Sequence, residues 1–319
     1  MGNYILKRTL LIIPTMFLVS IIVFLLQRFI PGSAVDVIEA QFIAMGQTDI
    51  DRAAIIHQLG LDVPILQQYI NWIGGIITRG DFGTSMLQNK PVLDLIASRV
   101  GPTLELGFMS VIFANLFGLP LGIYTAARQG KLADTLFRPL SVLLISIPSF
   151  WLATMVMIYP VRWWGWSPSM ELISFTQDPW GNFVQFAIPA VINGAVMSGV
   201  TMRMVRTQML DVLRQDYVRT AWSKGLGEKT VIIRHSIKNA FIPVITVIGG
   251  QLANVIGGTV IMENIFNIPG MGQLALTALN DRDYPVVSAI VLLVSLVVLI
   301  CNLLVDISYS WLDPRVRYQ

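Results

Sequence analysis

The sequence predicts an all-α membrane protein with six transmembrane helices. The chain has 319 residues, of which 54% are hydrophobic and 13% charged. A soluble domain carries about 25% charged residues, so this chain has too little polar surface to cover a globule of its size. Apolar runs of the roughly 20 residues needed to cross a bilayer recur along the chain. The six runs are 9–30, 103–127, 137–161, 183–205, 240–262 and 286–307.

The first run is expected to stay in the protein as a span. Lys7 and Arg8 precede an apolar stretch that continues to Ile30. A cleaved signal peptide has a shorter apolar core, followed by a small-residue cleavage site, and this stretch shows neither feature. Residues 1–30 are therefore predicted to form a cytoplasmic amino terminus and the first span.

Lys and Arg residues predict the orientation in the membrane. If the amino terminus is cytoplasmic, roughly two thirds of the 22 Lys and Arg residues fall in cytoplasmic segments, as the positive-inside rule expects. Both termini are then cytoplasmic, and residues 308–319 form a cytoplasmic tail. The Trp-rich segment around Trp163 and Trp180 suits a membrane–water interface. The alternative is an aromatic wall at the mouth of a substrate path.

Residues 31–102 are predicted to form a small helical segment on the extracytoplasmic side, between the first two spans. Asp49 can cap a short helix that has Gly60 at its C′ position. Pro64 fits the first turn of a second helix, which ends before Gly80. A third amphipathic helix, VLDLIASRV, leads into the membrane core at residues 103–307.

The sequence contains no recognisable site for catalysis. The G-x-x-x-x-G-K-[ST] phosphate loop is missing from the chain. The two histidines, His57 and His235, fall on opposite sides of the predicted membrane, which argues against a His-based metal pair. The single cysteine, Cys301, excludes an internal disulfide. We therefore expect no enzyme activity, no metal site and no cofactor in this chain.

Charged residues are almost missing from the interior of the predicted spans. Glu105 lies near the start of the second span and Asp306 at the end of the sixth. Carriers driven by ion gradients usually keep charged groups near the membrane midplane, so an external energy source or passive flow is expected instead. The polar residues in the spans can join helices through hydrogen bonds or line a polar path. They are Asn115, Asn193, Gln251, Asn254 and Asn302.

Small residues recur at helical spacing in the fifth predicted span. Gly249, Ala253 and Gly257 are four residues apart, as are Gly250, Asn254 and Gly258. Small residues at this spacing allow close approach of backbones, either in static packing or in a helix that moves against a partner beside a pathway. The predicted pathway or gate residues are Asn193, Gly250, Gln251, Asn254, Gly257 and Gly258.

A basic segment, Asp216 to Pro243, separates the fourth and fifth predicted spans. It predicts a helix over Asp216–Trp222, an interruption at two glycines, and a second basic helix that opens at Glu228 and continues into the fifth span. Such a segment can simply set the topology and contact lipid headgroups. It can also act as a lever that receives force from a motor outside this chain.

This segment resembles the "EAA" cytoplasmic loop of permease subunits of binding-protein-dependent ABC importers. In the family pattern, Glu-Ala-Ala is followed after three residues by Gly. Ala221 and Gly225 match this pattern, whereas Arg219 and Thr220 replace Glu and Ala, and Lys238 stands where Pro is usual. The loop is most similar to its form in the dipeptide, oligopeptide and nickel branch.

Further stretches extend the resemblance over essentially the whole chain. As a set in this order they are specific for the branch, although not for the substrate. They are GDFGTSMLQNKPVLDLIASRVGPTLEL, ISIPSFWLA, ENIFNIPGMGQL, DYPVV and DISYSWLDPRVRY.

The resemblance implies half of a translocation path in the bacterial inner membrane, built with a second, related but non-identical permease. An extracytoplasmic solute-binding protein would deliver short peptides. Two cytoplasmic ATPase subunits, which hold ATP and Mg²⁺, would receive the coupling loop, residues 206–239. The alternative substrates are nickel complexes, glutathione and oligosaccharides, and the alternative class is a channel or a gradient-driven carrier.

The resemblance also implies which residues couple the chain to the ATPase. Small side chains at positions 221 and 225 are expected on the contact face, because a helix that lies in a groove needs little bulk there. The implied coupling residues are Tyr217, Thr220, Ala221, Gly225 and Leu226.

Overall fold

The computed structural model describes residues 2–29, 35, 36, 39, 43, 46, 51–58, 60–165, 167, 169 and 171–312. It forms two compact units. Unit 1 comprises Met1–Ile5, Pro102–Pro269 and Ile300–Gln319, and unit 2 comprises Leu6–Gly101 and Gly270–Leu299.

The described residues are almost entirely helical. The elements are α1 (Gly2–Phe29), α3 (Arg52–Gln58), α4 (Ile65–Arg79), α5 (Val92–Ala127), α6 (Leu132–Ser146), α7 (Ser149–Trp164), α8 (Pro179–Leu213), α9 (Asp216–Ser223), α10 (Glu228–Thr230), the π-helix η1 (Val231–Ser236), α11 (Ile237–Ala253), α12 (Val255–Gly258), α13 (Val260–Ile265), α14 (Met271–Asn280) and α15 (Tyr284–Leu312).

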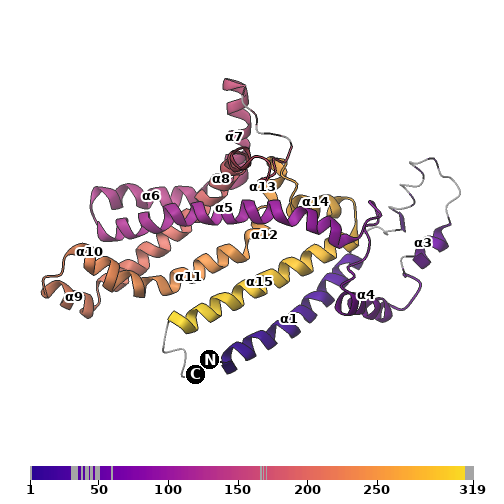
Figure 1. Cartoon of the computed structure of the whole chain (residues 1–319), viewed down its shortest axis with the longest axis horizontal. Helices are drawn as coiled ribbons and strands as arrows, with labels where there is room; N and C mark the ends of the chain where they lie inside the picture. The colour runs from indigo at the N-terminus through magenta and orange to yellow at the C-terminus, as the bar shows by residue number, and fades with distance from the viewer. Residues whose placement is uncertain are drawn as a thin grey trace. The chain divides into compact units, whose positions relative to one another are not determined.

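Five described helices are long and apolar enough to cross a membrane, and there is a sixth span if the bent pair α6–α7 counts as one. The segment predicted as the third span, 137–161, is not one straight helix, because α6 and α7 meet within it at an angle of 89°. Figure 1 shows α7 leaving the direction of α6. Pro148 explains the break, since a residue before proline avoids the helical region, and Ile147 is extended at φ −79° and ψ 122°.

The segment predicted as the fifth span, 240–262, is a continuous helix only up to Ala253. Helix α11 ends at Ala253, and α12 and α13 follow as short separate helices. Two consecutive glycines, Gly257 and Gly258, lower the helix propensity there. The side chain of Asn254 also donates a hydrogen bond to the carbonyl of Gly250 at 3.0 Å, a local bond of the kind that competes with regular structure. The chain turns after α13, where Asn267 has a left-handed φ of 51°.

In unit 1, helix α8 lies in close contact with both α5 and α6. A Cβ atom added at Gly118 of α5 would lie 2.8 Å from the Cβ of Thr201 on α8. A Cβ atom added at Gly199 of α8 would lie 2.7 Å from the carbonyl oxygen of Ser141 on α6. These backbones approach so closely only because glycine has no side chain. We call the three helices the α5–α6–α8 block.

An ion pair also joins α6 to α8. Arg206 donates to the carboxylate of Asp134 through Nε at 2.7 Å and through Nη2 at 2.9 Å. The same carboxylate accepts the backbone N–H of Gly130 at 3.0 Å. Asp134 is buried, so this two-pronged pair supplies the hydrogen bonds that a buried carboxylate requires.

In unit 2, helix α4 packs against α1 through aromatic side chains. The hydroxyl groups of Ser20 and Tyr69 lie 2.8 Å apart, and the rings of Phe24 and Tyr69 have centroids 5.2 Å apart. The predicted end of this helix before Gly80 is confirmed, because Gly80 adopts the left-handed conformation at φ 64°.

The helix predicted ahead of α4 is present as α3. Its first N–H groups are capped by Asp51, whose Oδ1 accepts from Ala53 at 3.0 Å and from Ala54 at 3.2 Å. Gly60 has a φ of 62°, as expected for a residue just beyond a helix end. The predicted cap, Asp49, lies outside the described residues.

A buried carboxylate holds the non-helical segment 80–91 of unit 2, which contains a turn at residues 86–88. Asp283 is 3% exposed and accepts hydrogen bonds from the hydroxyl of Ser85 and from the backbone N–H of Met86, the latter at 3.2 Å. Gly83 in this segment has a φ of 87°. These hydrogen bonds fix the position of Ser85 and Met86 in a segment that does not form a helix.

Candidate translocation cavity and coupling loop

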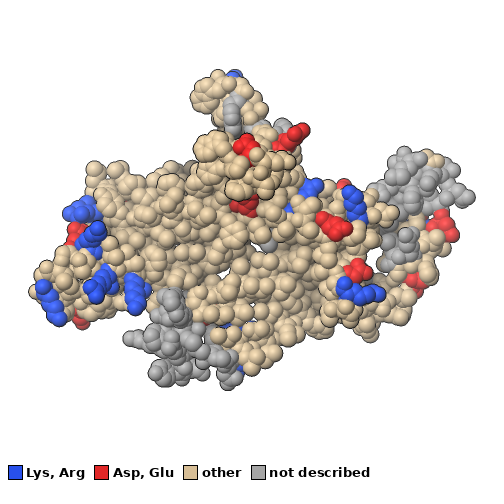
Figure 2. Space-filling model, viewed as in Figure 1, with Lys and Arg blue, Asp and Glu red and all other residues tan. Residues whose placement is uncertain are grey.

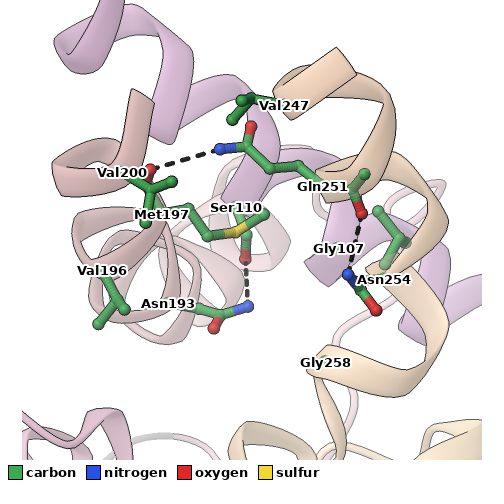
Figure 3. Close-up of a pocket in the computed structure, with 12 residues that line it drawn as sticks. Gly107, Ser110, Asn193, Val196, Met197, Val200, Val247, Gln251, Asn254 and Gly258 are labelled. Carbon is green, nitrogen blue, oxygen red and sulfur yellow. Dashed lines mark hydrogen bonds between the residues drawn. The ribbon is translucent and has the colours of Figure 1, made fainter. Parts of the chain in front are cut away.

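A cavity of about 330 Å³ lies within unit 1, between α5, α8 and the region from α11 to α12. All the predicted pathway residues except Gly257 line it. Its twelve lining residues (Figure 3) are Gly107, Ser110, Asn193, Val196, Met197, Val200, Val247, Gly250, Gln251, Asn254, Val255 and Gly258.

The polar groups of this cavity are neutral amides and a hydroxyl. Asn193 on α8 points toward Ser110 on α5 (Figure 3), and its Nδ2 donates to the Ser110 hydroxyl at 3.4 Å. Gln251 reaches across from α11 to the carbonyl of Met197 on α8, at 3.3 Å. The residues that line the cavity include no charged side chain. The cavity therefore offers donors and acceptors for hydrogen bonds without selecting one sign of charge.

The small residues of the fifth predicted span have three different environments. A Cβ atom added at Gly249 would overlap with Val305, so this glycine serves close packing against α15. Gly250 lines the cavity. Gly257 lies in open space, because an added Cβ atom would meet no described atom within 4 Å. Static packing within this chain therefore accounts for Gly249 but not for Gly257.

This difference predicts opposite outcomes for two identical substitutions. Gly257→Leu should leave insertion and thermal stability of the chain near the parent, yet reduce transport, because added bulk would face the path or a partner. Gly249→Leu should lower stability, because overpacking typically costs about 1–3 kcal/mol. Thermal unfolding in detergent and uptake by cells would be measured for both. Full transport by Gly257→Leu would show that a small residue is unnecessary there.

The loop between α8 and α11 has the predicted elements. The helix expected over Asp216–Trp222 is confirmed as α9, and the second helix opens at Glu228 as predicted. Gly225 between them has a left-handed φ of 77°, whereas Gly227 has an ordinary φ of −65°. From Glu228 the helix continues to Ala253 as one potential span, so the predicted connection between loop and span is confirmed.

Helix α9 has one face buried in unit 1 and one face exposed. Val218 and Ala221 are 0% and 5% exposed and form a cluster with Val231. Leu226 packs against the same cluster. The predicted reason for a small residue at 221 is therefore wrong. Ala221 lies on the buried face of α9, where a small side chain allows the helix to pack closely against Val231. It does not lie on the exposed face.

The outer face of α9 is formed by larger side chains. Tyr217 is 43% and Trp222 is 44% exposed, and Thr220 is also exposed. The hydroxyl of Tyr217 accepts a hydrogen bond from Asn239 at 2.7 Å, which ties the start of α9 to α11. Arg219, which replaces the family glutamate, pairs with Asp216 of its own helix at 2.7 Å.

Positive charge gathers at the end of unit 1 formed by α9 and α10 (Figure 2). Along α6 and the adjoining part of α5 the visible surface is mostly uncharged until it reaches this end, as expected for helices that face lipid. The exposed cations of the loop are Arg214, Arg219, Lys224, Lys229, Arg234 and Lys238.

The sequence did not predict the π-helix η1 between α10 and α11. Inside it, the buried hydroxyl of Ser236 donates to the carbonyl of Val231, five residues earlier, at 3.1 Å. Such turns are rare and often occur at functional sites. Ser110, Met197 and Thr201, which touch the cavity or its amides, were also missed, because one hydroxyl or thioether in a long apolar helix is no distinctive signal.

Comparison with protein families gives two matches that together cover most of the chain. Residues 118–318 match the family described as the binding-protein-dependent transport system inner membrane component. Residues 1–107 match the amino-terminal region described for the membrane component of the same systems.

Curated relatives align with the chain over its full length. It is 40% identical over 321 residues to the glutathione transport system permease protein GsiC of Salmonella typhimurium strain LT2, and 38% identical to GsiC of Escherichia coli strain K12. Both alignments cover 100% of each protein.

Among solved structures, the fold is similar to the MetNI methionine ABC transporter in inward-facing conformations. One crystal form has a TM-score of 0.56 and a second has 0.53, each at 16% identity, covering 69% of this chain and 97% of the other. At this identity the match concerns the fold alone.

Proposed function

Because the chain belongs to the inner-membrane components of binding-protein-dependent transport systems, we propose that it imports glutathione or closely related short peptides. The chain is a permease subunit of an ABC importer, located in the inner membrane. The observation that carries the substrate proposal is the 40% identity over the whole length to a glutathione permease. Glutathione is a tripeptide, so this proposal lies within the peptide class that the sequence suggests.

The cavity in unit 1 supports a peptide substrate. Its amide side chains, Asn193, Gln251 and Asn254, can exchange hydrogen bonds with peptide groups. Since no charge is present in the lining, both ends of a zwitterionic peptide can pass without being held at a fixed ion. We therefore assign the path to this cavity.

The proposed assembly contains this chain, a related second permease, two ATPase subunits that bind ATP and Mg²⁺, and an extracytoplasmic solute-binding protein. We propose six spans with both termini in the cytoplasm, which places α9 on the cytoplasmic side beside the ATPase. Tyr217, Thr220 and Gly225 would contact the ATPase from the exposed surface of the loop. Ala221 and Leu226 would support that surface from beneath.

Uptake by cells tests the substrate. The complete transporter, made in a host that lacks its own glutathione importer, should accumulate radiolabelled glutathione. A matched strain, with the phosphate-loop lysine of both ATPases replaced, should not, because hydrolysis would be lost. Accumulation of a nickel complex or an oligosaccharide instead of glutathione would reassign the substrate. Accumulation in the ATPase-deficient strain would favour the alternative class, a channel or a gradient-driven carrier.

A further inference from the structure

The contacts between helix α11 and the α5–α6–α8 block differ in kind from the contacts that hold the block together. Within the block, glycines bring backbones into contact, as at Gly118 and Gly199. Toward the loop, α11 instead packs on α8 through apolar side chains, among them Val244 against the cluster of Val205 and Met209. Apolar contacts have no fixed direction, so they permit α11 to shift along the block more readily than the glycine contacts would.

At the level of the cavity, Gln251 connects α11 to the block through hydrogen bonds, which have a fixed direction. This residue is 8% exposed. Its Nε2 donates to the hydroxyl of Thr201 at 2.8 Å and to the carbonyl of Met197 at 3.3 Å, both on α8. Its Oε1 accepts from Nδ2 of Asn115, on α5, at 3.0 Å. One buried amide therefore bridges three helices.

Asn115 has one further hydrogen-bonding group available. Its Nδ2 donates to Gln251 and also to the carbonyl of Val111 at 2.8 Å. Its buried Oδ1 has no hydrogen-bond partner among the described residues. A buried acceptor without a partner is costly, so Oδ1 is a ready site for a donor that moves toward it.

We infer that Gln251 is a positioning residue that exchanges hydrogen-bond partners when α11 moves during transport, and this rests on the proposed function of the cavity and loop. In the arrangement described here, Nε2 of Gln251 is bonded to Thr201 on α8. In the second arrangement, Nε2 leaves Thr201 and donates to Oδ1 of Asn115, which gives a reciprocal amide pair with α5. Both arrangements keep the buried amide bonded, so α11 has two defined positions rather than a continuous range.

The continuous helix from Glu228 to Ala253 connects this amide to the coupling loop. A displacement of α9 by the ATPase would reach α11 through η1 and change the position of Gln251 relative to Thr201. The side chain of Gln251 also lines the cavity. The same exchange would therefore change the cavity between α8 and α11 where substrate passes.

Thiol accessibility tests the exchange. Asn254→Cys in a Cys301→Ser background gives this chain a single cysteine beside the cavity. The rate of its reaction with a membrane-impermeant thiol reagent is measured in the complete transporter, with and without non-hydrolysable ATP. The ratio of the two rates reports the balance of the two arrangements. Thr201→Val should shift this ratio about threefold, the size expected for one interhelical hydrogen bond in a bilayer. Gln251→Met should also shift it, and Thr201→Ser should restore it.

Thr125→Val is the matched control. Thr125 is as buried as Thr201, but its hydroxyl donates only to the carbonyls of Leu121 and Gly122 in its own helix, so the ratio should not change. Suppose that the parent reacts at different rates with and without the nucleotide, and that Thr201→Val, Gln251→Met and Thr125→Val all give the same ratio of rates as the parent. This result would overturn the inference and leave the proposed path intact. Equal rates for the parent with and without the nucleotide would overturn both this inference and the proposed path.

Discussion

Gly225→Trp is expected to abolish ATP-coupled transport while leaving insertion of the permease into the membrane intact. Gly225 has a φ of 77°, and a residue with a side chain pays about 1–2 kcal/mol to adopt that conformation. The loop would then change its path between α9 and α10, and the indole would cover the exposed surface beside Thr220. Substrate-stimulated ATP hydrolysis by the reconstituted complex should fall to the basal rate.

Gly227→Trp is the matched control for this substitution. Gly227 is also exposed, and a Cβ atom added there meets no atom within 4 Å, yet its φ of −65° suits any residue. The Gly227→Trp variant should retain substantially more substrate-stimulated ATP hydrolysis than Gly225→Trp. Gly225→Asn should retain part of it as well, because Asn tolerates the left-handed region. Normal stimulated transport by Gly225→Trp would refute the assignment of this loop to coupling.

Arg206→Met is expected to destabilise the permease by about 3–5 kcal/mol, because it leaves the buried carboxylate of Asp134 without its partner. The guanidinium of Arg206 bonds both oxygens of this carboxylate. Arg203→Met, three residues earlier on the same helix, is the control, since Arg203 is exposed. The unfolding temperature in detergent should fall for Arg206→Met and stay near the parent for Arg203→Met.

A double substitution separates lost pairing from lost packing. Asp134→Leu combined with Arg206→Met removes both charges and should recover most of the stability, since apolar replacement of a buried ion pair is often neutral or better. An equally low unfolding temperature for the single and the double variant would mean that the charges themselves are not responsible. The pair would then matter through its packing or its bonds to the turn at Gly130.

The local features of the loop could be predicted from the sequence. Asp216 and Glu228 at the helix starts and two glycines between them are short-range signals, and the structure has both helices where they were expected. The role of Ala221 could not be predicted in this way. A small residue suits an outer contact and an inner contact equally well, and only the three-dimensional fold shows that it packs beneath α9.

The membrane helices show the same limit. Hydropathy located the apolar segments, but it did not reveal the bend at Pro148 or the break after Ala253, because both segments remain apolar across the break. The spacing of glycines in the fifth predicted span suggested one stripe, yet Gly249 and Gly257 have unrelated surroundings. Asn115, Thr201 and Gln251 are far apart in sequence, so their hydrogen bonds depend on which helices become neighbours.

Transport by purified protein in liposomes tests the central claim most directly, namely that this chain provides a path that is driven by ATPase subunits through the loop at residues 206–239. Liposomes that contain both permeases, both ATPases and internal ATP should accumulate labelled glutathione delivered by the binding protein. Liposomes that contain the permeases alone should not. Accumulation or equilibration of glutathione by the permeases without ATPase subunits would contradict the account.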